Sequence, residues 1–198
     1  MKIISTFVLI TVSLCAGLCC PPEEDYNYES IQIQNDHLIN IENDQNTFQL
    51  NDTIYINTVI NNIQKTIDGI DINLTDYLIT EEAPSLFYNM TLYKETNFGT
   101  PVKITVTNDN LIVINGSVEN TYDSLIEVKN NYNDNDIDFK SKFGIKLLEK
   151  GSYYLASPNT DYINQIEIYG NTIDNYQLLI TSKIRNSDEN SIYRFTVE

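Results

Sequence analysis

The segment IDFKSKFGIKL, residues 137–147, decides the fold class of this chain. Its odd-numbered positions are apolar at all but one residue, and Asp or Lys fills most of the positions between them. The apolar positions are Ile137, Phe139, Phe143, Ile145 and Leu147. Because successive side chains of a β-strand point to opposite faces, this alternation predicts a strand with one face in a core and one in water.

The same period of two recurs along most of the chain. It appears in residues 53–60, 86–92, 104–106, 126–128, 165–169, 176–184 and 193–197. The continuous apolar run Leu-Ile-Val-Ile at 111–114 predicts a strand that is short and buried or covered on both faces. Clusters of Asn, Asp and Gly separate these segments and favour turns. About nine short strands at this spacing predict a β-sandwich or a β-barrel.

A local motif points to one kind of sandwich. Leu148, Gly151 and Tyr153 form the pattern Leu-x-x-Gly-x-Tyr, which resembles the tyrosine corner of Greek-key, immunoglobulin-like β-sandwiches. The resemblance implies that the Tyr153 hydroxyl bonds to main chain a few residues upstream. Strand alternation places the neighbouring Tyr154 on the opposite face. We therefore expect an all-β, Greek-key immunoglobulin-like β-sandwich over residues 46–198.

Two segments fit the pattern less well. Residues 20–45 are acidic and rich in Asn and Gln, so they predict a tether, although 31–33 and 38–41 are alternatively edge strands. Residues 61–84 are interpreted as an insertion between strands, with a hairpin turn at Asp68-Gly69 and a short helical turn near 76–78. Binding surfaces often lie on such insertions.

The N-terminus has the form of a secretory signal peptide, residues 1–19. Lys2 supplies a positive tip, residues 3–14 form an apolar run, and small residues and cysteines follow. The run is too short for a comfortable transmembrane helix. All three cysteines, Cys15, Cys19 and Cys20, lie in or directly after this leader, so the body cannot be stapled by disulfides.

The run Cys20-Pro-Pro-Glu-Glu-Asp resembles the start of surface lipoproteins of the Bacteroidetes and flavobacteria. The resemblance implies a lipid on Cys20, with Cys19 as the alternative, and export to the outer face of the outer membrane. The family prefers Gly, Ala or Ser before the lipidated cysteine, whereas Leu18 precedes Cys19 and Cys19 precedes Cys20. The alternative is an ordinary cleaved signal, which gives a freely secreted protein.

Charge and residue content exclude several classes of function. With 28 Asp and Glu against 12 Lys and Arg, the net charge of −16 repels nucleic-acid phosphates. The single histidine, His37, lies in the expected tether, so histidine-based catalysis lacks its usual base. The body also lacks the Cys and His ligands that zinc requires. We predict no catalytic residues, no cofactor and no metal site.

Two other features are weighed as binding signals. Asp134, Asp136 and Asp138 offer oxygen ligands for calcium in one loop, but Phe139 and Ile145 occupy the positions where an EF-hand needs Gly and Glu. An ordinary polar hairpin is therefore expected. The 14 tyrosines can supply aromatic platforms for a glycan, although the chain has no tryptophan.

Four Asn-x-Ser/Thr sequons occur, at Asn51, Asn73, Asn89 and Asn115. They are glycan acceptors in a eukaryotic or viral secreted protein and arise by chance in an Asn-rich bacterial one. The sequence thus predicts a non-enzymatic cell-envelope lipoprotein, at the outer membrane or cell surface, that binds or scaffolds a protein or glycan ligand. The alternatives are a freely secreted β-sandwich glycoprotein and a carbohydrate-active enzyme or its accessory module.

Overall fold

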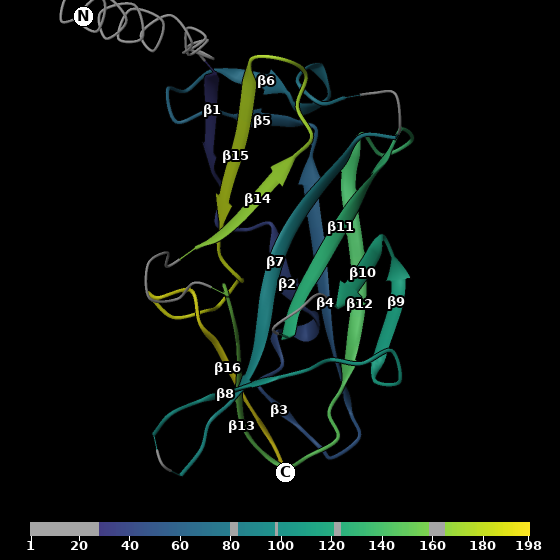
Figure 1. The fold of residues 1–198 in the computed structure, drawn as a ribbon, viewed down its shortest axis with the longest axis vertical. Helices are drawn as coiled ribbons and strands as arrows, with labels where there is room; N and C mark the ends of the chain where they lie inside the picture. Colours follow the sequence, from purple (N-terminus) through teal and green to yellow (C-terminus); the bar gives the residue numbers. More distant parts are fainter. Residues whose placement is uncertain (1–27, 80–82, 98, 121–123, 159–164) are drawn as a thin grey trace, which may run out of the picture.

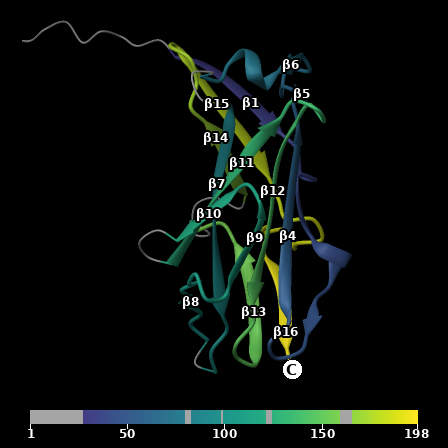
Figure 2. The same ribbon diagram turned by 90° about the vertical axis from the view of Figure 1, so that its right-hand side faces the viewer.

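Alternating apolar and polar residues build two layers of strands in the computed structural model, which describes residues 28–79, 83–97, 99–120, 124–158 and 165–198. Within these ranges the chain forms sixteen strands and two single-turn 3-10 helices. Figures 1 and 2 show an elongated β-sandwich, with the C-terminus at one end of its long axis. The all-β sandwich expected from the sequence is confirmed.

The first layer is centred on one long strand. In order, it contains β1 (Glu29–Gln34), β15 (Tyr176–Ser182), β14 (Ile166–Gly170), β7 (Ser85–Lys94), β11 (Leu125–Asn133) and β10 (Ser117–Asn120). At its C-terminal end, β7 also pairs with β13 (Gly151–Ala156) and β8 (Val102–Ile104), and β13 leads on to β16 (Tyr193–Val197) and β3 (Thr47–Phe48). Several neighbouring strands are distant in sequence, such as β14 and β7 or β13 and β7, as Greek-key connections require.

The second layer is smaller. It contains β9 (Leu111–Asn115), β12 (Asp138–Lys146), β4 (Thr53–Asn61) and β2 (Ile39–Ile41), in that order. The β11–β12 hairpin joins the two layers, because these strands pair only where Asn131–Asn133 meets Asp138–Lys140. Beyond that end they separate, with β7 and β11 on one side in Figure 2 and β4 and β12 on the other.

The core lies between the layers and follows the predicted alternation. On β7 the buried side chains are Leu86, Tyr88, Met90 and Leu92. On β12, Phe139, Phe143 and Ile145 are buried opposite Ile60, Ile56 and Ile54 of β4. Ile137 departs from the prediction: it is 55% exposed. The strand begins one residue later, and Ile137 lies in the hairpin turn with a φ of +56°.

Residues 111–114 contradict the sequence interpretation. They form β9, as expected for a strand, but the strand is neither buried nor covered on both faces. Among the described residues β9 pairs with β12 alone, so it forms the edge of the second layer. A strand that overhangs the core in this way keeps its apolar side chains in water.

The acidic N-terminal segment also differs from the first expectation. Of the two alternatives for residues 20–45, the structure shows the edge strands from Glu29 onward. β1 pairs in parallel with β15, and β2 pairs antiparallel with β4. The sheet therefore extends N-terminal of Asn46, the expected start of the domain. Ile31 and Ile33 make this possible, since they are buried while the polar residues beside them face water.

The insertion at 61–84 contains the expected hairpin. Strands β5 (Ile63–Lys65) and β6 (Asp71–Asn73) form a separate two-stranded sheet. Gly69 has a φ of +84° in the turn between them, which glycine adopts most easily. The 3-10 helix η2 (Leu74–Asp76) follows, and a second one, η1 (Glu42–Asp44), follows β2.

Candidate binding site

One side of β9 presents main chain that no described strand pairs with. Leu111 lies opposite Ile145 and Val113 opposite Phe143, and no described strand pairs with the other side of β9. In an antiparallel pair, alternate residues direct their N–H and C=O groups away from the partner. These groups of β9 are therefore available. The strand lies along the right-hand border of Figure 1, the side that Figure 2 turns toward the viewer.

The side chains of β9 are as accessible as its main chain. Ile112, Val113 and Ile114 are 42%, 45% and 56% exposed. Edge strands of soluble proteins usually carry a charge or a proline, or are twisted away by a bulge. β9 has no charged residue and no proline, and its one bulge, at Ile114, lies near the end of its pairing with β12, so Leu111, Ile112 and Val113 pair regularly. We therefore identify β9 as the candidate site, here called the β9 edge.

An aromatic ring borders the β9 edge on the outer face of the second layer. Gly144 lies between Ile112 of β9 and Tyr55 of β4. A Cβ atom on Gly144 would lie 2.7 Å from Tyr55 Cε1, so the missing side chain leaves room for the ring. Lys142 Nζ lies 5.6 Å from the centre of that ring and 3.0 Å from Glu42 Oε1.

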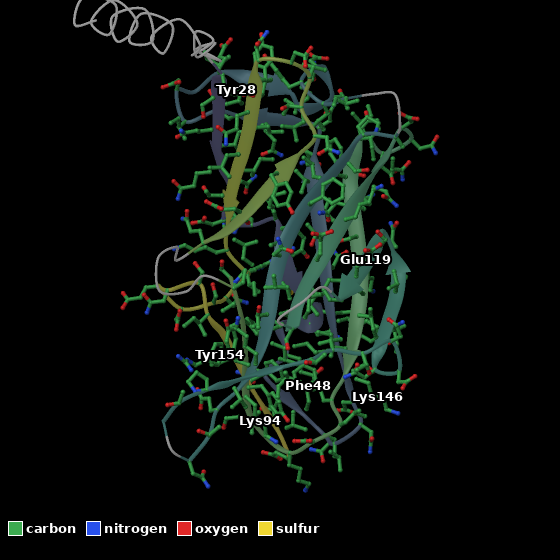
Figure 3. All side chains as sticks on the ribbon, in the orientation of Figure 1. Tyr28, Phe48, Lys94, Glu119, Lys146 and Tyr154 are labelled. Atoms are coloured by element: carbon green, nitrogen blue, oxygen red, sulfur yellow. The ribbon has the colours of Figure 1, made fainter. Side chains whose placement is uncertain are left out.

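One lysine beside the edge is available. Lys146 is the last residue of β12, and its backbone N–H donates to the carbonyl of Asn110 at 2.8 Å. Its side chain is exposed (Figure 3) and makes no ion pair within the described part of the chain. It therefore places a positive charge at the Asn110 end of β9. The other two lysines of the same strand face are engaged, Lys142 as above and Lys140 with two aspartates.

The motif around Tyr153 is built as a tyrosine corner. Tyr153 Oη donates to the carbonyl oxygen of Glu149 at 2.9 Å, and its ring stacks on Phe195 with centroids 5.6 Å apart. Gly151 has a φ of +143° and approaches Lys94 Cε so closely that a Cβ would lie 3.0 Å from it. Leu148 is exposed, so the neighbouring Leu147 supplies the buried apolar contact instead.

The corner also contains an ion pair at the surface. Lys94 Nζ lies 2.6 Å from Glu149 Oε2 and 5.4 Å from the centre of the Tyr153 ring. The bond to Glu149 raises the pKa of Lys94, and the same bond lowers the pKa of Glu149. A cavity of 220 Å³ lies next to this group, lined by Leu92, Ile104, Leu147 and Tyr153 among others. The corner residues thus serve the packing of this end of the sandwich.

Tyr154 lies on the opposite face of β13, but that face is covered. Its ring stacks on Tyr93 with centroids 4.7 Å apart, and the Arg194 guanidinium lies 5.4 Å from its centre. Arg194 also pairs with Glu95, and the two residues line a pocket of 270 Å³. Because Tyr93 and Arg194 already occupy the faces of Tyr154, this ring offers no open platform for a sugar.

The loop at 130–138 is the polar hairpin expected from the sequence. Lys140 Nζ lies 2.7 Å from Asp136 and 2.9 Å from Asp138, so an ammonium group occupies the place between these carboxylates. Asp134 is exposed and stands apart from the pair. The described residues contain no group of three or more His, Cys, Asp or Glu side chains suited to hold a metal ion.

Two side chains with chemistry suited to catalysis, His37 and Tyr88, do not form part of a catalytic group among the described residues. His37 is exposed in the turn after β1, where its backbone N–H donates to Asn35 Oδ1 at 3.3 Å. Tyr88 is fully buried with its hydroxyl 2.8 Å from Thr58 Oγ1, and burial raises the pKa of Tyr88. A substrate cannot reach a side chain enclosed in this way.

The leader cysteines Cys15, Cys19 and Cys20 lie outside the described residues. The described residues include no helix with the length and hydrophobicity needed to cross a bilayer. Of the sequon asparagines, Asn51, Asn73 and Asn115 are exposed, whereas the side-chain oxygen of Asn89, in the middle of β7, is buried.

Comparison with known proteins gives matches among solved structures only. No family model matches the chain, and no curated protein matches it. Among solved structures, the chain is similar to a non-cellulosomal cohesin from the hyperthermophilic archaeon Archaeoglobus fulgidus. The identity is 16%, the alignment covers 77% of this chain and 93% of the cohesin, and the TM-score is 0.28. At these values the similarity carries no inference about function.

The β9 edge is the feature that sequence reasoning missed. The run at 111–114 is typical of a buried strand, and its exposure depends on which segments lie beside it. The turns that flank the run, at Asn108-Asp109-Asn110 and Asn115-Gly116-Ser117, do not signal its exposure. Strands β14 and β16 are equally short, and alternate residues of both are buried in the core.

Proposed function

We propose that this chain is a non-enzymatic binding module displayed at the cell envelope, held there by a lipid on Cys20 or Cys19. The observation that carries the proposal is the placement of the two ends of the described chain. Tyr28 lies at one end of the long axis (Figure 3), and the C-terminal Glu198 lies at the other (Figure 1). A tether attached before Tyr28 therefore holds the molecule by one pole.

The length of the tether supports this arrangement. Cys20 precedes Tyr28 by eight residues (28 − 20 = 8), and eight residues span at most about 28 Å when fully extended. The body then stays close to the membrane at the β1 end. The β9 edge runs along the side of the molecule and remains open to a ligand.

Binding accounts for the exposed groups better than catalysis does. The titratable groups described above form ion pairs, lie buried or stand alone, so they do not assemble into an acid, a base and a nucleophile. The β9 edge instead offers main-chain hydrogen bonds and apolar surface, which are means of recognition. Sustained turnover on any member of a panel of glycans would overturn the non-enzymatic part of the proposal.

Replacement of both leader cysteines tests the anchor. The wild-type chain is expected in the membrane fraction with a mass increased by acyl groups, because each buried methylene contributes about 0.8 kcal/mol. The double variant Cys19→Ala, Cys20→Ala is expected in the soluble fraction, whereas Cys15→Ala serves as the matched control and should remain with the membrane. A double variant that still pellets with membranes contradicts the anchor.

A freely secreted glycoprotein is the second candidate, and the exposure of Asn51, Asn73 and Asn115 favours it. The two candidates predict different modifications of the intact protein. Acyl groups on the N-terminal cysteine support the lipoprotein, and mass that an N-glycosidase removes supports the glycoprotein.

A further inference from the structure

We propose that the β9 edge binds an extended segment of another polypeptide, which adds to the second layer as one more strand beyond β9. The inference deepens the proposed function and rests on it, because it names the class of ligand for a binding module.

The main chain of β9 provides the primary interaction. Five residues form an edge about 17 Å long, at about 3.3–3.4 Å per residue. The strand is hydrogen-bonded to β12 on one side only within the described residues. An added strand would pair with the remaining N–H and C=O groups, as extended peptides do at the free edges of other sheets.

The side chains of β9 indicate what the added strand contains. Val113 lies opposite the buried Phe143, on the inner face, and Ile112 lies opposite Gly144, on the outer face beside Tyr55. Apolar surface is thus exposed on both faces of the edge. The segment that fits best has consecutive β-branched apolar residues, so that each face of the added strand finds an apolar neighbour.

The size of the edge favours a peptide over a second copy of this chain. A stable interface between folded proteins buries at least about 1,200 Å², and a strand of five residues is too short to provide that area alone. Two copies with a net charge of −16 each also repel one another. A flexible tail or linker needs less area, because the main-chain bonds and the apolar contacts are concentrated in a few residues.

Lys146 sets the expected orientation. Its ammonium group lies at the Asn110 end of the edge and has no carboxylate partner among the described residues. Charges farther away than about 8 Å are largely screened at physiological ionic strength, so the local lysine outweighs the overall negative charge at this point. We therefore expect a carboxylate at the end of the segment that lies beside Lys146.

A designed peptide tests the inference with the purified full-length protein. The probe is fluorescein-labelled Thr-Val-Ile-Val-Thr-Glu, and the matched control carries the same side chains with N-methyl groups on alternate residues, which removes main-chain donors. We expect saturable binding of the probe by fluorescence anisotropy and at least tenfold weaker binding of the control. Bound probe should slow amide exchange in residues 111–115.

Variants of the protein locate the site. Ile114→Lys lies at the end of β9 away from Lys146, and it should weaken binding at least fivefold; Ile112→Lys is a second variant with the same expectation. Val102→Lys on β8, which replaces an apolar residue of intermediate exposure between Ile112 and Ile114, should leave binding unchanged. Lys146→Glu should weaken binding of the probe and strengthen binding of the version that ends in Lys. Unchanged denaturant midpoints confirm that each variant is folded.

Several results overturn the inference. No saturable binding, equal binding of the N-methylated control, or protection outside 111–115 each excludes strand addition at β9. Dimerisation of the protein alone that Ile114→Lys abolishes assigns the edge to a second copy instead. If the wild-type chain still fractionates with membranes, any of these results leaves the proposed function intact. If the wild-type chain is instead found in the soluble fraction, the proposed function fails, and the peptide result still stands.

Discussion

The edge strands on the two long sides of the sandwich differ in whether another segment of the chain contacts their outer side. On one side, Ile33 of β1 bridges to Thr66, and the main chain of β2 accepts a bond from Arg185 N–H at Ile39, 2.8 Å away. On the other side, β9 pairs with β12 and with no further described segment. The first side is closed by the chain itself, and the second is open.

The covered edge strands are the polar ones, and the exposed edge strand is the apolar one. β1 and β2 come from an Asn- and Gln-rich segment, and their few isoleucines are buried because other segments fold over them. β9 is almost wholly apolar and is exposed. The comparison shows that coverage of an edge depends on where distant segments return to it. The peptide proposed above would cover the apolar residues at the open side.

The largest expected effect tests the closed side. Ile39 is fully buried, so Ile39→Ala removes core methylenes and should lower the free energy of unfolding by about 2–5 kcal/mol. Ile114 is exposed on the open side, and Ile114→Ala should change it by no more than about 0.5 kcal/mol. Denaturant titration of the two variants measures both values. Similar losses would show that β9 stabilises the fold, and its exposure would then need no ligand.

The next effect tests the turn that joins β9 to β10 on the open side. Gly116 joins β9 to β10 with a φ of +78°, and a Cβ there would lie 2.4 Å from the carbonyl oxygen of Lys129. Gly116→Ala should therefore cost at least about 2 kcal/mol, from backbone strain and from the clash together. Gly69→Ala is the control, because its φ of +84° is similar but a Cβ would meet no atom within 4 Å. Equal midpoint shifts in denaturant would mean that the clash at Gly116 is relieved at no cost.

The same contrast explains how much could be predicted from the sequence. The periodic strands, including β12, β7 and β16, could be predicted because the alternation of apolar and polar residues depends only on the sequence of each segment. The Tyr153 bond was also within reach, since its acceptor Glu149 is four residues away. Local patterns carry information about local contacts.

Edge coverage could not be predicted, because it depends on contacts between residues far apart in sequence. Ile39 is bridged by Ile184, and β9 receives no equivalent neighbour among the described residues. The residues at 31–33 alone leave open whether they form a tether or an edge strand, because the choice depends on pairing with the distant strand β15. The candidate site was missed for the same reason, since an apolar run alone does not tell whether a second strand will cover it.

An intermediate effect tests the tyrosine corner between β12 and β13, where the Tyr153 hydroxyl donates to the carbonyl oxygen of Glu149. Tyr153→Phe leaves the buried ring in place and removes the donor to Glu149, so it should cost about 1–3 kcal/mol. Tyr176→Phe is the matched control: this half-buried tyrosine packs on Tyr77 through its ring, and its loss of a hydroxyl should cost no more than about 0.5 kcal/mol. Denaturant midpoints that shift equally would show that the corner bond contributes little.

The smallest effect is a pH dependence at the same corner. The bond to Lys94 lowers the pKa of Glu149, so the folded state holds this carboxylate ionised to lower pH than the unfolded chain does. The resulting stability is fully present above the unfolded pKa of about 4.3 and is lost as the pH falls through the lowered folded value. Glu149→Gln should therefore lose less stability than the wild type between pH 7 and pH 3. Glu119→Gln, at an exposed position on β10, should follow the wild type over the same range. Thermal unfolding of the three proteins at both pH values measures the difference, and identical slopes for Glu149→Gln and the wild type would show that solvent screens the pair completely.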